Sequence, residues 1–174
     1  MERVPMKEPP FLYRLTDVGI ANNPLPVFDE VLRYWNRCRG DRFAPAWTDM
    51  DLMAFPLQVL PYTIVVDIQT PPQPILYRYY GSGIARNHGF EMTNRTSDDI
   101  QPEQLRQHIL SQYAIIIEAR TPRLFATDIY VKRGLRLQDL VLRLPLSSDG
   151  VTVTNVITVE QPWNEGDLQT GTDS

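Results

Sequence analysis

Residues 62–84 read YTIVVDIQTPPQPILYRYYGSGI, and this stretch decides the fold. From 62 to 68, large apolar or aromatic residues alternate with threonine, valine and aspartate, which is the period of a strand with one buried face. A proline-rich turn follows, and residues 75–80 predict a second strand. Gly81 and Gly83 permit the tight backbone that leads into a short helix. The stretch therefore predicts a strand pair that feeds a helix.

Downstream, the sequence predicts one long helix and then three strands. Pro102 suits the first position of a helix, and apolar residues at helical spacing extend it to about residue 119. After Pro122 the period changes to two, and glycine-containing turns separate three strand-like runs. These runs predict an antiparallel meander over residues 124–131, 137–146 and 151–159.

The two ends of the chain differ from this central part. Residues 28–39 predict an amphipathic helix that ends at Gly40. Residues 1–27 contain several prolines and isolated apolar residues, so we expect an extended N-terminal arm without a regular element. Residues 161–174 are mostly polar and predict a disordered tail. The sequence therefore predicts one domain over residues 28–160.

Composition restricts the kind of protein. A chain of 174 residues that is 43% hydrophobic is long enough for one domain with a substantial core. The net charge of −4 disfavours binding to nucleic acid, which requires a basic surface. A single cysteine, Cys38, cannot form an internal disulfide, and no apolar run approaches the roughly 20 residues of a membrane helix. We therefore expect a cytoplasmic protein that is not bound to a membrane.

The order of two strands, short helices, a longer helix and three antiparallel strands resembles the PAS domain. The resemblance is closest to a bacterial group of small single-PAS proteins of undefined function. It is carried by Tyr34-Trp35 to Arg39-Gly40, Leu60-Pro61, Tyr77 to Gly81, Leu144 to Ser147 and Asp149-Gly150. It implies an α+β fold in which helices cover one face of a five-stranded antiparallel sheet around a small cavity, with an additional N-terminal helix. The group has a second glycine shortly after the position of Gly89; this chain has none there, and Asn94 is a candidate for the left-handed conformation instead.

The resemblance implies a sensory or regulatory module that binds a small molecule or a protein partner. Because the sequence shows no kinase, cyclase or DNA-binding segment, we expect a signal in trans to another protein, and an apolar leading helix favours a homodimer. Two alternatives stay open. One is a ligand-free interaction or dimerisation domain whose cavity is filled by side chains such as Met53, Tyr79 and Phe90. The other is a small enzyme with a buried acid such as Asp128, but no nucleophile or base lies at a recognisable spacing, so we expect no enzyme and no catalytic residue.

Asn155 is the strongest candidate for a ligand contact. It lies on the apolar side of the last strand, where a buried amide without a hydrogen-bond partner costs about 1–3 kcal/mol. The PAS resemblance places that side toward the cavity, so Asn155 together with Arg78 or Tyr79 could orient a polar ligand. A bulge that turns Asn155 outward, or a bond to nearby backbone, is the alternative.

His108 completes the set of candidate ligand-binding residues. On the predicted long helix it lies where haem-binding PAS domains place their axial histidine, although a packing role is the commoner one for a single histidine. Cys38 precedes the core and does not match the cysteine motif of flavin-binding light sensors. No spacing of histidine, cysteine and carboxylate residues indicates a zinc site. The sequence therefore predicts no metal site and leaves the cofactor unidentified.

Overall fold

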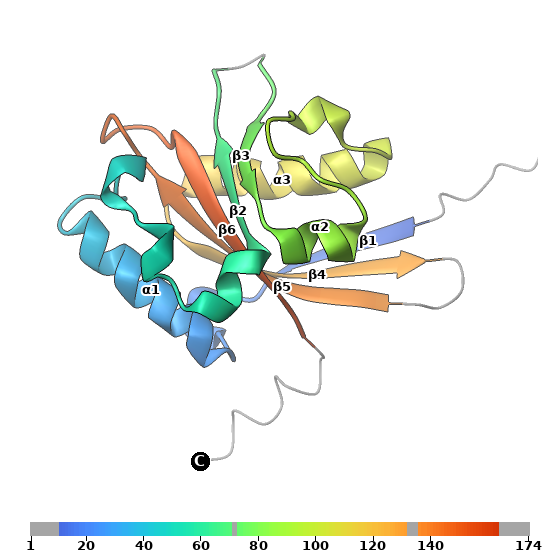
Figure 1. The fold of residues 1–174 in the computed structure, drawn as a ribbon, viewed down its shortest axis with the longest axis horizontal. Helices are drawn as coiled ribbons and strands as arrows, with labels where there is room; N and C mark the ends of the chain where they lie inside the picture. The colour runs from blue at the N-terminus through green and yellow to red at the C-terminus, as the bar shows by residue number, and fades with distance from the viewer. Residues whose placement is uncertain (1–10, 71–72, 132–135, 164–174) are drawn as a thin grey trace, which may run out of the picture.

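The computed structural model describes residues 11–70, 73–131 and 136–163, which form a six-stranded antiparallel sheet with helices on both sides (Figure 1). The strands lie in the order β1-β4-β5-β6-β2-β3. They are β1 (Phe11–Asp17), β2 (Thr63–Asp67), β3 (Leu76–Tyr80), β4 (Arg123–Val131), β5 (Arg136–Leu146) and β6 (Asn155–Pro162). The α-helices are α1 (Pro26–Arg39), α2 (Ser82–His88) and α3 (Glu103–Ala119). Short 3-10 helices connect them: η1 (Ile20–Asn22), η2 (Trp47–Asp49), η3 (Leu52–Ala54), η4 (Leu57–Tyr62) and η5 (Ser97–Asp99).

The predicted five-stranded sheet is wrong by one strand. Within the predicted N-terminal arm, β1 pairs with β4 along its whole length, from Phe11 opposite Val131 to Asp17 opposite Phe125. Among the described side chains of β1, only Tyr13 and Leu15 point into the domain. Tyr13 stacks on the ring of His108 on α3, and Leu15 packs against the core. Two half-buried residues beside several prolines are too weak a period-2 pattern to predict a strand.

Helices cover both faces of the sheet, because the predicted additional N-terminal helix packs on the face opposite the other helices. One face packs against α1 and the 3-10 helices that follow it, around Phe28, Trp35 and Val59. The other face packs against α2, α3 and the segment between them, around Tyr113 and Ile116. Figure 1 shows α1 and α3 on opposite sides of the strands. We refer to the first as the α1 face and to the second as the α3 face.

The central strand β5 is buried on both of these faces. Its leucines Leu140, Leu142, Leu144 and Leu146 belong to the core on the α1 face. The alternate residues include Val141 in the core of the α3 face and Arg143, which is 3% exposed. Leucines that alternate with residues of which some are charged are typical of a strand with one solvent-exposed face, but β5 is buried on both faces.

The last hairpin begins later than the sequence predicts. The expected strand start at residue 151 lies instead in the β5–β6 turn, because the Asp149 carboxylate accepts the backbone N–H groups of Val151 and Thr152. A hydrogen bond from the Thr152 hydroxyl, together with these two from the backbone, holds the pKa of Asp149 well below its usual range. The chain re-enters the sheet at Asn155, and Gln161 and Pro162 of the predicted tail still belong to β6; residues 164–174 lie outside the described residues.

Asn94 confirms one local prediction. Its φ of 63° places it in the left-handed region, as expected for a substitute for glycine. The backbone there bonds to β3, since Asn94 N–H donates to the carbonyl of Tyr77 and the Tyr77 N–H donates to the carbonyl of Arg95. This segment therefore covers the free edge of β3.

Candidate functional site

A small cavity lies on the α3 face of the sheet, between the strands and the helices α2 and α3. Its volume is about 50 Å³. Aromatic and aliphatic side chains form most of its wall, among them Tyr77, Tyr80, Phe90 and Tyr113. The polar residues that line it are His88, His108, Gln112, Thr127, Asp139, Arg143 and Glu160. They come from α2, α3, β4, β5 and β6, so the tertiary fold alone brings them together.

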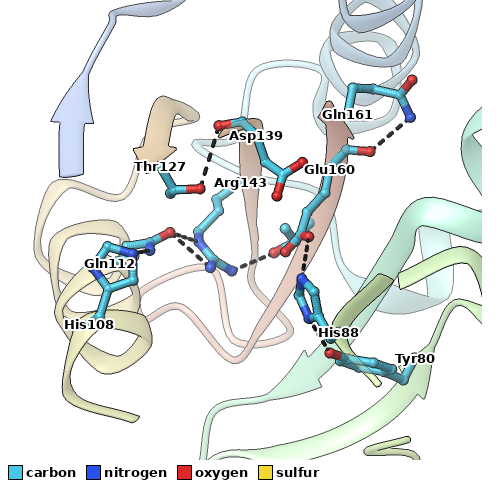
Figure 2. A network of polar contacts seen from close by, with 10 residues as sticks. Tyr80, His88, His108, Gln112, Thr127, Asp139, Arg143, Glu160 and Gln161 are labelled. Atoms are coloured by element: carbon cyan, nitrogen blue, oxygen red, sulfur yellow. Dashed lines mark hydrogen bonds and ion pairs between the residues drawn. The ribbon is translucent and has the colours of Figure 1, made fainter. Parts of the chain in front are cut away.

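Arg143 is the buried cation of this cavity (Figure 2). Its Nε and one terminal nitrogen both donate to Oε1 of Gln112, at 3.0 and 2.9 Å. The other terminal nitrogen donates to the hydroxyl of Thr158 at 2.7 Å, and the guanidinium lies over the ring of Tyr113 at 4.3 Å. Each described hydrogen-bond partner of the guanidinium is therefore neutral, although a buried charge is normally held by an opposite one.

The acidic end of the cavity contains His88, Asp139 and Glu160. Nε2 of His88 lies 3.4 Å from a carboxylate oxygen of Glu160, and Nδ1 of His88 lies 2.7 Å from the hydroxyl of Tyr80 (Figure 2). Among the described side chains, none donates a hydrogen bond to the carboxylate of Asp139. Burial, together with the nearby Glu160 carboxylate, raises the pKa of Asp139 to about 6.

The charges of this cluster compensate one another. Burial alone would lower the pKa of His88, but the carboxylates of Glu160 and Asp139 raise it above the usual value. Burial opposes ionisation of Glu160, yet His88 and Arg143 lower its pKa. The cavity thus holds an ionised Glu160 beside a histidine that gains a proton readily, and a second carboxylate that titrates near neutral pH.

This combination of a helix-covered antiparallel sheet and an interior cavity agrees with the sequence comparison. The family model of the PAS domain matches residues 26–159, which is more than half of the chain. The chain belongs to the PAS domain family. The narrower resemblance to a bacterial single-PAS group stays a prediction.

LOV domains are among the solved structures to which the chain is similar. The dark structure of the blue-light photoreceptor Aureochrome1 LOV has a TM-score of 0.47 and 16% identity, and the match covers 70% of this PAS chain and 89% of that chain. A fungal LOV domain photoreceptor gives 0.45 and 20%, with coverage of 83% and 96%. The LOV domain of a blue-light activated histidine kinase from Erythrobacter litoralis EL346 gives 0.41 and 14%, with coverage of 59% and 95%. No curated protein matches the chain.

The PAS cavity does not suit a flavin or a haem. A volume of about 50 Å³ is well below the roughly 300–1,000 Å³ of pockets that hold drug-sized ligands. Cys38 lies on α1 and packs in the core of the α1 face, on the other side of the sheet from the cavity.

Within the described part of the chain, no helix has the length and apolar character needed to cross a bilayer.

His108 is the one predicted ligand-binding residue that lines the cavity. Its ring stacks on Tyr13 of β1 at 5.2 Å, and its Nε2 lies 3.4 Å from the amide nitrogen of Gln112. Burial lowers the pKa of His108, and the charge of Arg143 lowers it further. These surroundings favour a neutral, packed histidine.

A pH titration of stability tests this assignment of His108. Since the folded-state pKa is depressed, the unfolded chain binds the proton more readily, so the stabilising contribution is present above about pH 6.5 and is lost as pH falls. We expect His108→Gln, which keeps a polar group beside Gln112, to lose less stability than wild type between pH 7 and pH 5. Urea unfolding at each pH measures the difference, and parallel curves for the two proteins would contradict it.

The other three predicted residues lie away from the cavity. Nδ2 of Asn155 donates to the carboxylate of Asp67 at 2.5 Å, and Arg78 binds the same carboxylate through two nitrogens, at 3.0 and 2.9 Å. Asn155 thus bonds to a side chain of β2, whereas the sequence left open a contact with a ligand, an outward turn at a bulge or a bond to nearby backbone. Val65 pairs with Tyr79 and Val66 with Tyr77, so a bulge at Arg78 directs it toward Asp67.

Asn155 shares its side of β6 with Ile157 and Val159, which pack on the α1 face. The expectation that this side lines the cavity therefore fails, because the cavity is on the α3 face. Tyr79 is 37% exposed, and its hydroxyl donates to the carbonyl of Leu60. Whether Asn155, Arg78 and Tyr79 bind a ligand stays a prediction, but they do not share a site with His108.

Sequence reasoning missed Arg143, Gln112 and the cluster of His88, Asp139 and Glu160 as cavity residues. The sequence offered one signal: Arg143 lies between Leu142 and Leu144, in a run of otherwise apolar residues from Leu140 to Leu146. Such an arginine is consistent with a surface position until both faces of the strand are known to be covered.

Proposed function

We propose that this PAS domain is a regulatory module that binds a small polar molecule in the cavity and passes the change to a protein partner in trans. The observation that carries the proposal is Arg143, a cation that is buried beside the cavity and whose described hydrogen-bond partners are all neutral. A ligand with an anionic hydrogen-bond acceptor would give Arg143 the charged hydrogen-bond partner that Gln112 and Thr158 are not.

The polar side chains of the cavity suggest the class of ligand. Arg143 contributes hydrogen-bond donors to the cavity wall, while Asp139 and Glu160 contribute acceptors. A molecule with an acceptor at one end and a donor at the other, such as a small amino acid or amide, complements both. The volume of about 50 Å³ limits it to a few non-hydrogen atoms.

The same contacts link the cavity to α3. Gln112, which is buried on α3, connects this helix to Arg143 of β5 through two hydrogen bonds. A ligand that takes over one of these bonds releases Gln112 and shifts the balance between two packings of α3 on the sheet. That change at α3 is the signal that we propose for the partner.

A titration followed by amide chemical shifts tests the proposal, with glycine and acetamide as probes. We expect dissociation constants in the millimolar range, corresponding to about 4 kcal/mol, and shifts that include amides of α3. Acetate has only the acceptor and methylammonium only the donor, so each should bind at least tenfold more weakly.

Arg143→Gln should weaken glycine binding at least tenfold, whereas Arg33→Gln on the exposed side of α1 provides a matched control with unchanged binding. Equal binding in wild type and Arg143→Gln would contradict the proposal. If no probe binds and the amides of α3 do not move, the alternative of a ligand-free interaction domain is favoured.

The side chains that the sequence offered as fillers of the cavity in a ligand-free interaction domain lie differently in the structure. Met53, which the sequence offered as a filler of the cavity, is 69% exposed, and Tyr79 is also at the surface. Phe90 does line the cavity. The apolar side of α1 packs on the chain's own sheet, so the proposed homodimer has to use other exposed apolar residues, of which Met53 and Leu57 are the most exposed among the described ones.

We propose a regulatory role and not an enzymatic one. Asp128, the acid of the enzyme alternative, alternates with Thr127 and Ile129 of the cavity wall and therefore points to the opposite face of β4. There its carboxylate accepts a hydrogen bond from Gln138 at 2.8 Å. It is thus separated from the cavity by the sheet.

A further inference from the structure

We propose that His88, Asp139 and Glu160 form a binding site for a divalent transition-metal ion such as Zn²⁺. One nitrogen or oxygen atom from each of the three residues lies within 4.8 Å of the other two. The residues come from the end of α2, from β5 and from β6, and Figure 2 shows their side chains converging. This inference stands whether or not the domain regulates a partner.

The distance between the first two ligands already suits a metal. Zinc binds nitrogen and carboxylate oxygen at about 2.0–2.2 Å, so two ligands of one tetrahedral ion are about 3.4 Å apart. His88 Nε2 and the Glu160 carboxylate oxygen are separated by 3.4 Å. Asp139 completes the set after a small rotation of its carboxylate, which no hydrogen bond from a described side chain restrains.

The contact of Tyr80 with the second ring nitrogen of His88 also supports a metal site. Its hydroxyl lies 2.7 Å from Nδ1 of His88, so a proton on Nδ1 can be donated to this oxygen while Nε2 faces the carboxylates. A histidine that binds a metal through one nitrogen usually donates a hydrogen bond from the other, which fixes the ring. Tyr80 is 5% exposed, so its position is set by packing.

Charge and shape also favour a cation here. The side chains of His88 and Glu160 are only 25% and 12% exposed, and two carboxylates close together in such a place repel each other. A divalent ion offsets both charges, although the positive charge of Arg143, which lowers the pKa of Glu160, offsets part of the negative charge already. Three protein ligands leave a fourth position that faces the cavity, where a water molecule fits.

The ligand set identifies the class of metal. Imidazole with carboxylates suits Zn²⁺, Fe²⁺ or Mn²⁺, while Mg²⁺ prefers oxygen ligands and water. The competing explanation needs no metal: a protonated His88 pairs with Glu160, and Asp139 stays neutral.

Isothermal titration of the chelator-treated full chain with ZnCl₂, without glycine or acetamide, separates the two explanations. We expect one zinc per chain with a dissociation constant of about 1 µM or below, and no binding of MgCl₂ at millimolar concentration. With CoCl₂ we expect visible absorption bands of a four-coordinate ion.

Variants locate the ion. Asp139→Asn loses no described hydrogen bond, so it should fold as wild type and bind zinc at least 100-fold more weakly; Glu160→Gln provides a second ligand variant. Tyr80→Phe should weaken binding about 10- to 100-fold through His88. Glu118→Gln, an exposed acid on α3, is the matched control with unchanged binding.

Zinc affinity that is equal in wild type, Asp139→Asn and Glu160→Gln would overturn the site, as would no binding by wild type at 100 µM zinc. Circular dichroism confirms that each variant is folded. Glycine binding by the metal-free protein is measured separately, so a failure of the metal site leaves the proposed ligand site untouched, and the reverse also holds.

Discussion

Replacing Gly81 by alanine is expected to destabilise the domain by about 3 kcal/mol or more. A Cβ atom at residue 81 would lie 2.3 Å from the carbonyl oxygen of Pro61 and 2.9 Å from that of Thr63. Both are backbone atoms, and the Gly81 N–H donates to the same Thr63 carbonyl at 2.9 Å. The clash can therefore be relieved only by moving the end of η4 and the first residue of β2 away from Gly81.

Urea unfolding of Gly81→Ala against wild type measures the loss. Gly150→Ala is the matched control, because its φ of 73° disfavours alanine by about 1–2 kcal/mol while no atom lies within 4 Å of the added Cβ. A cost for Gly81→Ala no larger than that of the control would show that the backbone approach is looser than the structure has it.

Trp35→Ala should cost about 3–5 kcal/mol. Trp35 is 2% exposed, packs between α1 and the leucines of β5, and donates its indole N–H to the carbonyl of Pro145 at 3.0 Å. Pro145 has no N–H to give to a neighbouring strand, and β4 does not reach this part of β5, since the β4–β5 pairing begins at Arg143. Trp35 therefore donates a hydrogen bond to the Pro145 carbonyl in a part of β5 that β4 does not pair with.

Trp35→Phe separates the two contributions. It keeps most of the apolar contact but leaves the Pro145 carbonyl without its donor, so we expect a loss of about 1–3 kcal/mol. Thermal or urea unfolding of both variants provides the measurement. A phenylalanine variant as unstable as the alanine variant would assign the role of Trp35 to the hydrogen bond and not to packing.

Local patterns predicted most of the fold because most elements carry a strong period. The predicted helices at residues 28–39 and 102–119 correspond to α1 and α3 with boundary differences of at most two residues. Gly81 is expected from the sequence to permit a tight backbone, but its φ of −60° suits any residue, and it is the close approach to Pro61 that excludes a side chain.

The cavity could not be predicted because no local pattern describes it. Arg143 alternates with leucines, while Asp139 and Glu160 each have one apolar neighbour and one glutamine neighbour. These patterns are the same for a strand with one exposed face and for a strand covered on both faces. The assignment of Asn155 to the cavity failed for a related reason, since two apolar faces existed and the sequence does not say which of them is next to α3. Only the packing of two helical layers resolves this.

The edge strand β1 has a practical consequence for how the domain is produced. The family match begins at residue 26 and ends at residue 159, so a fragment cut at those limits omits β1, Glu160 and Trp163. Removing β1 would uncover the nine-residue strand β4, whose free N–H and C=O groups would then offer a template for other chains. Such a fragment would tend to aggregate for a reason unrelated to its core, and its insolubility would say nothing about the stability of the intact chain.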